Sequence, residues 1–165
     1  MEDNKKQFRE RRGRQERPGS EEKEFDQVNL DLARVTRVTK GGKRMRFRAA
    51  VVIGDRKGRV GFGIAKGSDV SLAVNKAARH AKKNVFKVTL EGTTIPHWIK
   101  AKENAAKILL KPAPSGSGII AGGAMRVVLE LAGVPDVVGK MLGANNKINN
   151  ARATITALKG LKSRI

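Results

Sequence analysis

Apolar and charged positions alternate most regularly between Arg44 and Ile53. A period of two residues is the pattern of a β-strand, whose successive side chains point to opposite faces of a sheet. One face of this strand is predicted to carry Met45, Phe47, Ala49 and Val51. The other face is predicted to carry Arg44, Arg46 and Arg48. We expect the apolar face to pack and the arginine face to remain accessible.

Two further strands are predicted on either side of this one. β-Favouring residues extend from Gln27 to Thr39 and lead into a glycine turn at Lys40–Lys43. A second turn, Asp55–Gly58, leads into a strand at Arg59–Lys66. Gly61 and Gly63 share one face of that strand, where glycine is unfavourable unless a ligand or another backbone comes close. Close approach of RNA and packing of the following helix both explain these glycines.

A helix capped by Ser68 or Asp69 is predicted to run to about Val85. Its inner stripe comprises Val70, Val74, Ala77, Ala78 and Ala81. Its outer face comprises Lys76, Arg79, His80, Lys82 and Lys83. The outer face is therefore basic, and His80 fits a surface contact with water or phosphate.

The second half of the chain alternates strands with helices. Strands are predicted at residues 85–90, 94–100, 105–111 and 137–142, and a loop at 112–118. Helices are predicted from Gly123 to near Gly133, and from the capping Asn146 to Gly160. Trp98 is predicted in the core, with stacking on a base as the alternative. This order of elements implies an α/β sandwich, and an α+β fold for the whole chain.

Charge divides the chain more sharply than hydrophobicity does. The 165 residues carry a net charge of +20, of which +14 lies between Arg34 and Lys87. Such a field disfavours the compact state and is usually matched by a polyanion, so we expect nucleic acid as the partner. After Lys87 the charge is lower, and protein contacts are expected to outweigh RNA contacts. We predict a disordered mixed-charge arm at residues 1–26, an RNA-binding domain at 27–91 and a second domain at 92–165.

The basic segment supplies the candidate RNA contacts. Arginines two residues apart on a strand lie about 6.8 Å from one another, and guanidinium binds phosphate bidentately. An ordinary solvated strand face is the alternative, but acids would then be interspersed. The candidate RNA-binding residues are Arg34, Arg37, Lys40, Lys43, Arg44, Arg46, Arg48, Arg56, Lys57, Arg59, Lys66, Lys76, Arg79, Lys82 and Lys83.

The sequence lacks the residues that several classes of function require. Cysteine is absent, which excludes disulfides and zinc–thiolate sites, and no second ligand lies at helical spacing from His80. The glycines at 116–123 lack the Lys-Ser or Lys-Thr of a P-loop. The few carboxylates after Asp31 are unpaired in sequence. We expect no enzyme activity, cofactor, metal or small-molecule substrate. With no signal core or apolar span in the sequence, we expect no membrane partner and a cytoplasmic location.

Three segments together resemble the bacterial small-subunit (30S) ribosomal protein S-five family. They are Val38–Arg44, Val52–Gly63 and Gly118–Arg126, and Arg152-Ala153-Thr154 fits as well. The resemblance covers about residues 27–162. It implies a first domain like the double-stranded-RNA-binding fold without its first helix, and a second α/β sandwich with a left-handed crossover.

The resemblance also implies a place in the ribosome. The family binds 16S rRNA near the junction of head and body, contacts ribosomal proteins S-four and S-eight, and influences decoding accuracy and the path by which messenger RNA enters. Arg37, Val38, Thr39, Lys40, Gly41 and Gly42 match the loop that reaches toward the spectinomycin site. Gly118, Gly122, Gly123 and Arg126 match the region that faces the S-four protein, although Arg126 also fits a helix cap or an RNA contact. A free-standing double-stranded-RNA regulator is the alternative function.

Overall fold

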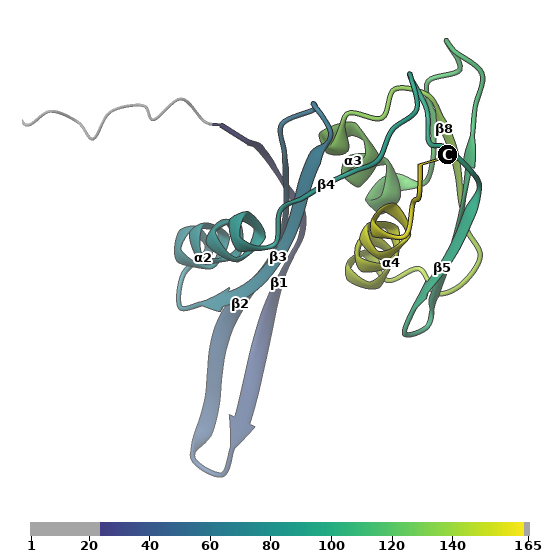
Figure 1. The fold of residues 1–165 in the computed structure, drawn as a ribbon. Helices are drawn as coiled ribbons and strands as arrows, with labels where there is room; N and C mark the ends of the chain where they lie inside the picture. Colours follow the sequence, from purple (N-terminus) through teal and green to yellow (C-terminus); the bar gives the residue numbers. More distant parts are fainter. Residues whose placement is uncertain (1–23, 164–165) are drawn as a thin grey trace, which may run out of the picture.

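The computed structural model describes residues 24–163. Of the arm predicted at residues 1–26, residues 1–23 lie outside this range, and Asp26 already belongs to the first strand. The first sheet is antiparallel with strand order β1-β2-β3-β4. It comprises β1 (Asp26–Thr39), β2 (Gly42–Gly54), β3 (Arg59–Gly67) and the short β4 (Phe86–Lys87), with α2 (Val70–Lys83) between the last two. Figure 1 shows the β1–β2 hairpin extending well beyond the rest of the sheet. The predicted order of three strands and a helix is confirmed.

Strand β2 is covered on both faces along its second half. Ala49, Val51 and Ile53 pack against α2, whereas Ala50 and Val52 join the core of the second domain. Successive residues of β2 therefore continue to point to opposite faces, and each face packs into a different hydrophobic core. The prediction that the odd-numbered face packs holds from Phe47 onward, but Met45 is 52% exposed because α2 does not reach that far along the hairpin.

The glycines of β3 make room for α2. A Cβ at Gly63 would lie 2.1 Å from the carbonyl oxygen of Ala77, and one at Gly61 would lie 2.6 Å from that of Ala81. Backbone and helix meet directly here, so side chains larger than hydrogen do not fit. Of the two explanations open from the sequence, helix packing is the one the structure supports.

The second sheet has one face covered by helices. Its strand order is β5-β6-β8-β7, and β7 and β8 form its only parallel pair among the described residues. The elements are β5 (Ile99–Glu103), β6 (Ala106–Pro112), β7 (Ile119–Ile120), α3 (Gly123–Ala132), β8 (Val137–Met141) and α4 (Lys147–Lys159). Asn146 Oδ1 accepts hydrogen bonds from the N–H groups of Ile148 and Asn149, as the predicted cap requires. The α+β class is confirmed, and the handedness of the β7–α3–β8 crossover stays a prediction.

The two sheets stand on either side of α3 and α4, giving the layers α2, sheet, helices, sheet (Figure 1). One apolar cluster includes Val52 and Phe62 of the first sheet together with Leu129 and Leu158 of the helices. Backbone hydrogen bonds also join the two parts, from Arg56 N–H to Leu131 O at 3.1 Å and from Gly58 N–H to Ala132 O at 3.0 Å. The parts are therefore packed on a shared core.

Two predictions for the connecting segment are wrong. The chain bends at the buried Pro96 and at His97, and β5 begins only at Ile99, because proline cannot donate to a strand ladder. Trp98 is 61% exposed and is not in the core. The Lys100 ammonium lies 5.8 Å from the centroid of its ring, so the indole is held at the surface beside a cation. The strand predicted at 85–90 is reduced to Phe86–Lys87.

Candidate nucleic-acid interface

The hairpin carries a basic surface on the face of the first sheet opposite α2. Cross-strand neighbours share a face, and the register pairs Arg37 with Arg44, Val35 with Arg46, and Arg48 with Lys66. We call Arg37, Arg44, Arg46 and Lys66 the hairpin surface. These four residues help line a hollow of about 280 Å³. Like charges directly opposite one another destabilise a sheet, so this surface fits a polyanion as its partner.

Arg48 differs from its neighbours. Its Nη2 lies 3.2 Å from Asp31 Oδ2, and both side chains are half-buried. Its Nε has no hydrogen-bond partner in the described part of the chain. Part of its charge is therefore already neutralised inside the hairpin. The structure separates Arg48 from Arg44 and Arg46, which the sequence placed together.

The remaining hairpin candidates lie at or near its end. Lys40 and Lys43 are exposed at the tip, where Thr39 Oγ1 donates to the carbonyl of Gly42 at 3.1 Å. Val38 is 68% exposed there. Arg34 pairs with Phe47 and so lies on the other face, toward α2. The segment 37–42 is thus an exposed projection at the far end of the molecule (Figure 1).

The turn between β2 and β3 holds its arginines in ion pairs. Arg59 Nε lies 2.7 Å from Asp55 Oδ2, Arg59 Nη1 lies 3.2 Å from Glu24, and its guanidinium lies 4.9 Å from the Phe25 ring centroid. Arg56 Nε lies 3.0 Å from Asp26. Burial acts to raise the pKa of Asp55, but hydrogen bonds from the Arg59 side chain and from backbone N–H groups outweigh it and lower that pKa. Of the predicted residues here, only Lys57 has a side chain that forms no ion pair with an acid among residues 24–163.

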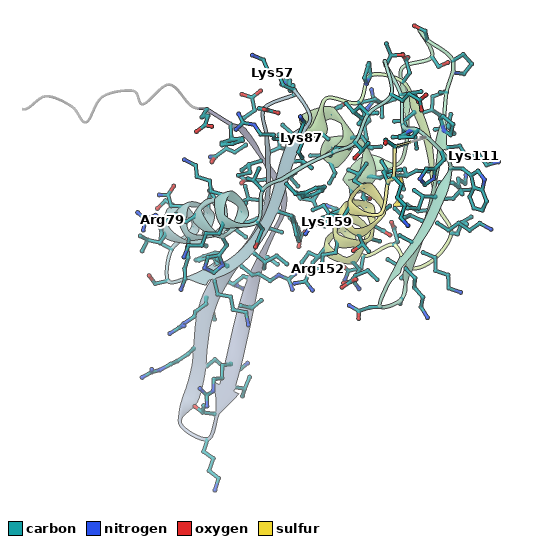
Figure 2. The ribbon with its side chains drawn as sticks, viewed as in Figure 1. Lys57, Arg79, Lys87, Lys111, Arg152 and Lys159 are labelled. Carbon is teal, nitrogen blue, oxygen red and sulfur yellow. The ribbon has the colours of Figure 1, made fainter. Side chains whose placement is uncertain are left out.

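Helix α2 presents a second basic face, on the opposite side of the sheet from the hairpin surface. Lys76, Arg79, Lys82 and Lys83 are exposed. Asp69 occupies the N-cap position, but its carboxylate accepts from Ser71 Oγ at 2.6 Å and makes no side-chain capping bond. Figure 2 shows Arg79 pointing away from the sheet. The predicted RNA-binding residues are therefore distributed over two faces.

Sequence reasoning missed a groove between the domains. It has a volume of about 490 Å³, and its basic lining includes Lys83, Arg152 and Lys159, with His80 beside them. Figure 2 shows Arg152 and Lys159 on the side of α4 toward the first sheet. Lys159 Nζ also lies 5.0 Å from the centroid of the Phe86 ring. The spacing of Arg152 and Lys159 on one helix face was a signal, but only the packing shows that His80 and Lys83 lie opposite.

The glycine-rich segment is anchored by a buried carboxylate. Gly118 N–H donates to Asp136 Oδ1 at 2.9 Å, and this bond lowers the pKa of Asp136, while burial acts in the opposite direction. Gly118 has φ +70°, a value that favours glycine, whereas Gly123 has open space around it and no such backbone requirement. Gly122 is the N-cap residue of α3, and Arg126 Nε lies 2.9 Å from Glu130 within that helix. Arg126 N–H donates to the carbonyl of Gly122 at 2.8 Å, so these two residues are adjacent at the start of α3.

No group of three His, Asp or Glu side chains within residues 24–163 is placed to hold a metal ion. None of the helices in this part of the chain is long and apolar enough to span a membrane.

Comparison with protein families decides the identity. Residues 25–89 match the family model described as ribosomal protein S5, N-terminal domain, and residues 101–164 match ribosomal protein S5, C-terminal domain. The chain belongs to the ribosomal protein S5 family. Members are RNA-binding proteins of the small ribosomal subunit that act in translation as structural components, not as enzymes, in cytoplasmic ribosomes. Family membership also favours the ribosomal role over the free-standing regulator.

Proposed function

We propose that the hairpin surface anchors this protein to 16S rRNA near the junction of head and body. The observation that carries the proposal is the directly opposed pair Arg37 and Arg44, flanked by Arg46 and Lys66 without an acidic partner among the described residues. A projecting strand pair can follow an RNA groove, and each guanidinium can bind a phosphate bidentately. The exposed basic face of α2 provides a second set of backbone contacts.

We further propose a division of labour between the domains. Residues 27–91 carry the main rRNA anchor, and residues 92–165 contact ribosomal proteins S-four and S-eight. The segment 37–42 reaches toward the spectinomycin site, and the protein contributes to decoding accuracy and to the path of entering messenger RNA. The resemblance to the family and the exposure of the hairpin tip support this assignment.

The RNA anchor is tested with Arg44→Ala/Arg46→Ala, which spares the Arg48–Asp31 pair. Affinity for a 16S rRNA fragment should fall, and the slope of log affinity against log salt should flatten by about 1.4–1.8 for two lost phosphate contacts. Lys87→Ala/Lys147→Ala removes the same charge elsewhere and should leave the slope nearly unchanged. Equal slopes for the two double variants would contradict the proposal.

The protein interface is tested with Gly123→Arg. No heavy atom of residues 24–163 lies within 4 Å of a Cβ added at Gly123, and its φ is not positive, so bulk and charge are added without local strain. We expect near-normal rRNA affinity and altered miscoding in ribosomes that carry the variant. Lost rRNA affinity with unchanged miscoding would instead assign this segment to RNA.

A further inference from the structure

The open face of the second sheet gathers lysines that are scattered in the sequence. Helices α3 and α4 cover one face of this sheet, and no element within residues 24–163 packs on the other face (Figure 1). Across the open face, the register aligns three rows of residues. They are Lys102 with Lys107, Lys100 with Leu109 and Lys140, and Lys111 with Val138 and Ile120.

The five lysines of these rows are all exposed, and no outward position of the four strands is acidic. Figure 2 shows Lys111 pointing away from the rest of the molecule on this side. Lys102 and Lys107 are direct cross-strand neighbours, an arrangement that destabilises a sheet. Such a surface is suited to a polyanion, which would attract both lysines and screen the repulsion between them.

Trp98 lies at the edge of this face, two residues before Lys100. The residue is 61% exposed, and the Lys100 ammonium lies 5.8 Å from the centroid of its ring. Stacking of a base on an aromatic ring contributes about 1–3 kcal/mol and requires an unstacked base, which a duplex does not offer. Leu109, Val138 and Ile120 supply apolar surface between the lysines.

We propose that this lysine face, with Trp98, binds a single strand of RNA. The lysines contact the backbone, and an unpaired base stacks on Trp98. A four-stranded sheet with two helices on one side and a basic open face with an aromatic residue is an arrangement used for single-stranded RNA. The proposal rests on the proposed RNA-binding function and adds a second RNA site to it. This face and the hairpin surface belong to different sheets, with α3 and α4 between them. One molecule can then hold two RNA segments.

The chain provides its own reporter for this site, because Trp98 is its single tryptophan and tyrosine is absent. An oligouridylate of about 12 nucleotides, within the usual site size, is titrated into the full-length protein while Trp98 fluorescence is followed. We expect quenching on binding. In Lys102→Gln/Lys107→Gln the quenching should need more RNA, and its salt slope should fall by about 1.4. Trp98→Ala, followed with a labelled oligonucleotide, should lose about 5–150-fold in affinity.

Arg44→Ala/Arg46→Ala is the matched control, since it removes two charges from the hairpin surface. It should leave the Trp98 titration unchanged, so failure of the rRNA anchor and failure of the lysine face give different results. Absent quenching, or an unchanged titration for Lys102→Gln/Lys107→Gln, would overturn the proposal. Tighter binding of an RNA duplex than of the single strand at Trp98 would also overturn it. Equal quenching by polyglutamate would assign the face to an acidic protein.

Discussion

At the scale of single residues, the carboxylates have structural tasks. Asp55 fixes a turn by accepting from Lys57 N–H at 2.8 Å and Arg59 N–H at 2.9 Å. Asp136 holds the glycine-rich segment from within the core of the second domain. Both side chains stabilise the fold more when they are ionised, because a carboxylate is a stronger hydrogen-bond acceptor than a protonated carboxyl group.

Asp136→Asn should therefore destabilise the protein in a pH-dependent way. The pKa of Asp136 is lowered by folding, so its stabilising effect is present above the unfolded-state pKa of about 3.9 and is lost as pH falls through the folded value. We expect a lower urea midpoint than wild type at pH 7 and a shrinking difference below about pH 4. Asp26→Asn, in an exposed pair, is the charge-matched control. A difference that stays constant across this pH range would contradict the assignment.

At the scale of elements, the β1–β2 hairpin combines an internal ion pair with a surface left for RNA. Arg48 and Asp31 link its two strands where α2 still covers the sheet, and Arg44 and Arg46 continue past that point. Arginines that look equivalent in an alternating pattern thus have different tasks.

Arg48→Ala should reduce the free energy of unfolding by about 1 kcal/mol, the upper range for a partly exposed ion pair. Arg44→Ala/Arg46→Ala should change it by less than about 0.5 kcal/mol, because the two side chains are exposed and adjacent to like charge. Urea unfolding of both variants and of Asp31→Ala/Arg48→Ala measures these changes in the free energy of unfolding. Equal effects on stability would show that Arg48 has no separate structural role.

Most of the secondary structure could be predicted from the sequence, because period and capping residues are local signals. The hairpin, α2 and the Asn146 cap are examples. The lysine face could not be predicted, since Lys102, Lys107 and Lys140 meet only through strand register. The even-numbered face of β2 was misjudged beyond Arg48, because nothing local shows that Ala50 and Val52 meet the second domain. Trp98 was misplaced because its large apolar ring suggested burial.

At the scale of the whole molecule, the two domains are joined by a shared core and by backbone hydrogen bonds to Leu131 and Ala132. Separation would expose Val52 and Phe62 to water at about 25 cal/mol per Å² of apolar area. A rigid connection of this kind suits a protein that holds an RNA anchor and a protein interface at a fixed spacing.

Unfolding should accordingly occur in a single transition. Trp98 fluorescence reports on the second domain, and circular dichroism reports on both, so their urea curves should coincide. Leu131→Ala, which removes a buried side chain where the domains meet, should lower the free energy of unfolding by about 2–5 kcal/mol and shift both curves together. Two separated transitions in the wild-type protein would mean that the domains unfold independently.

The anchoring of the hairpin surface to rRNA is tested most directly inside the small subunit. Because the chain has no cysteine, Arg46→Cys gives a single attachment point for an iron chelate that cleaves nearby RNA. Glu130→Cys, on α3 beside Arg126, is the matched control position. In purified subunits containing one copy of the protein, we predict strong cleavage of 16S rRNA near the head–body junction from position 46 and weaker cleavage there from position 130. Intact rRNA with the chelate at position 46, in subunits that contain the protein, would contradict the anchor.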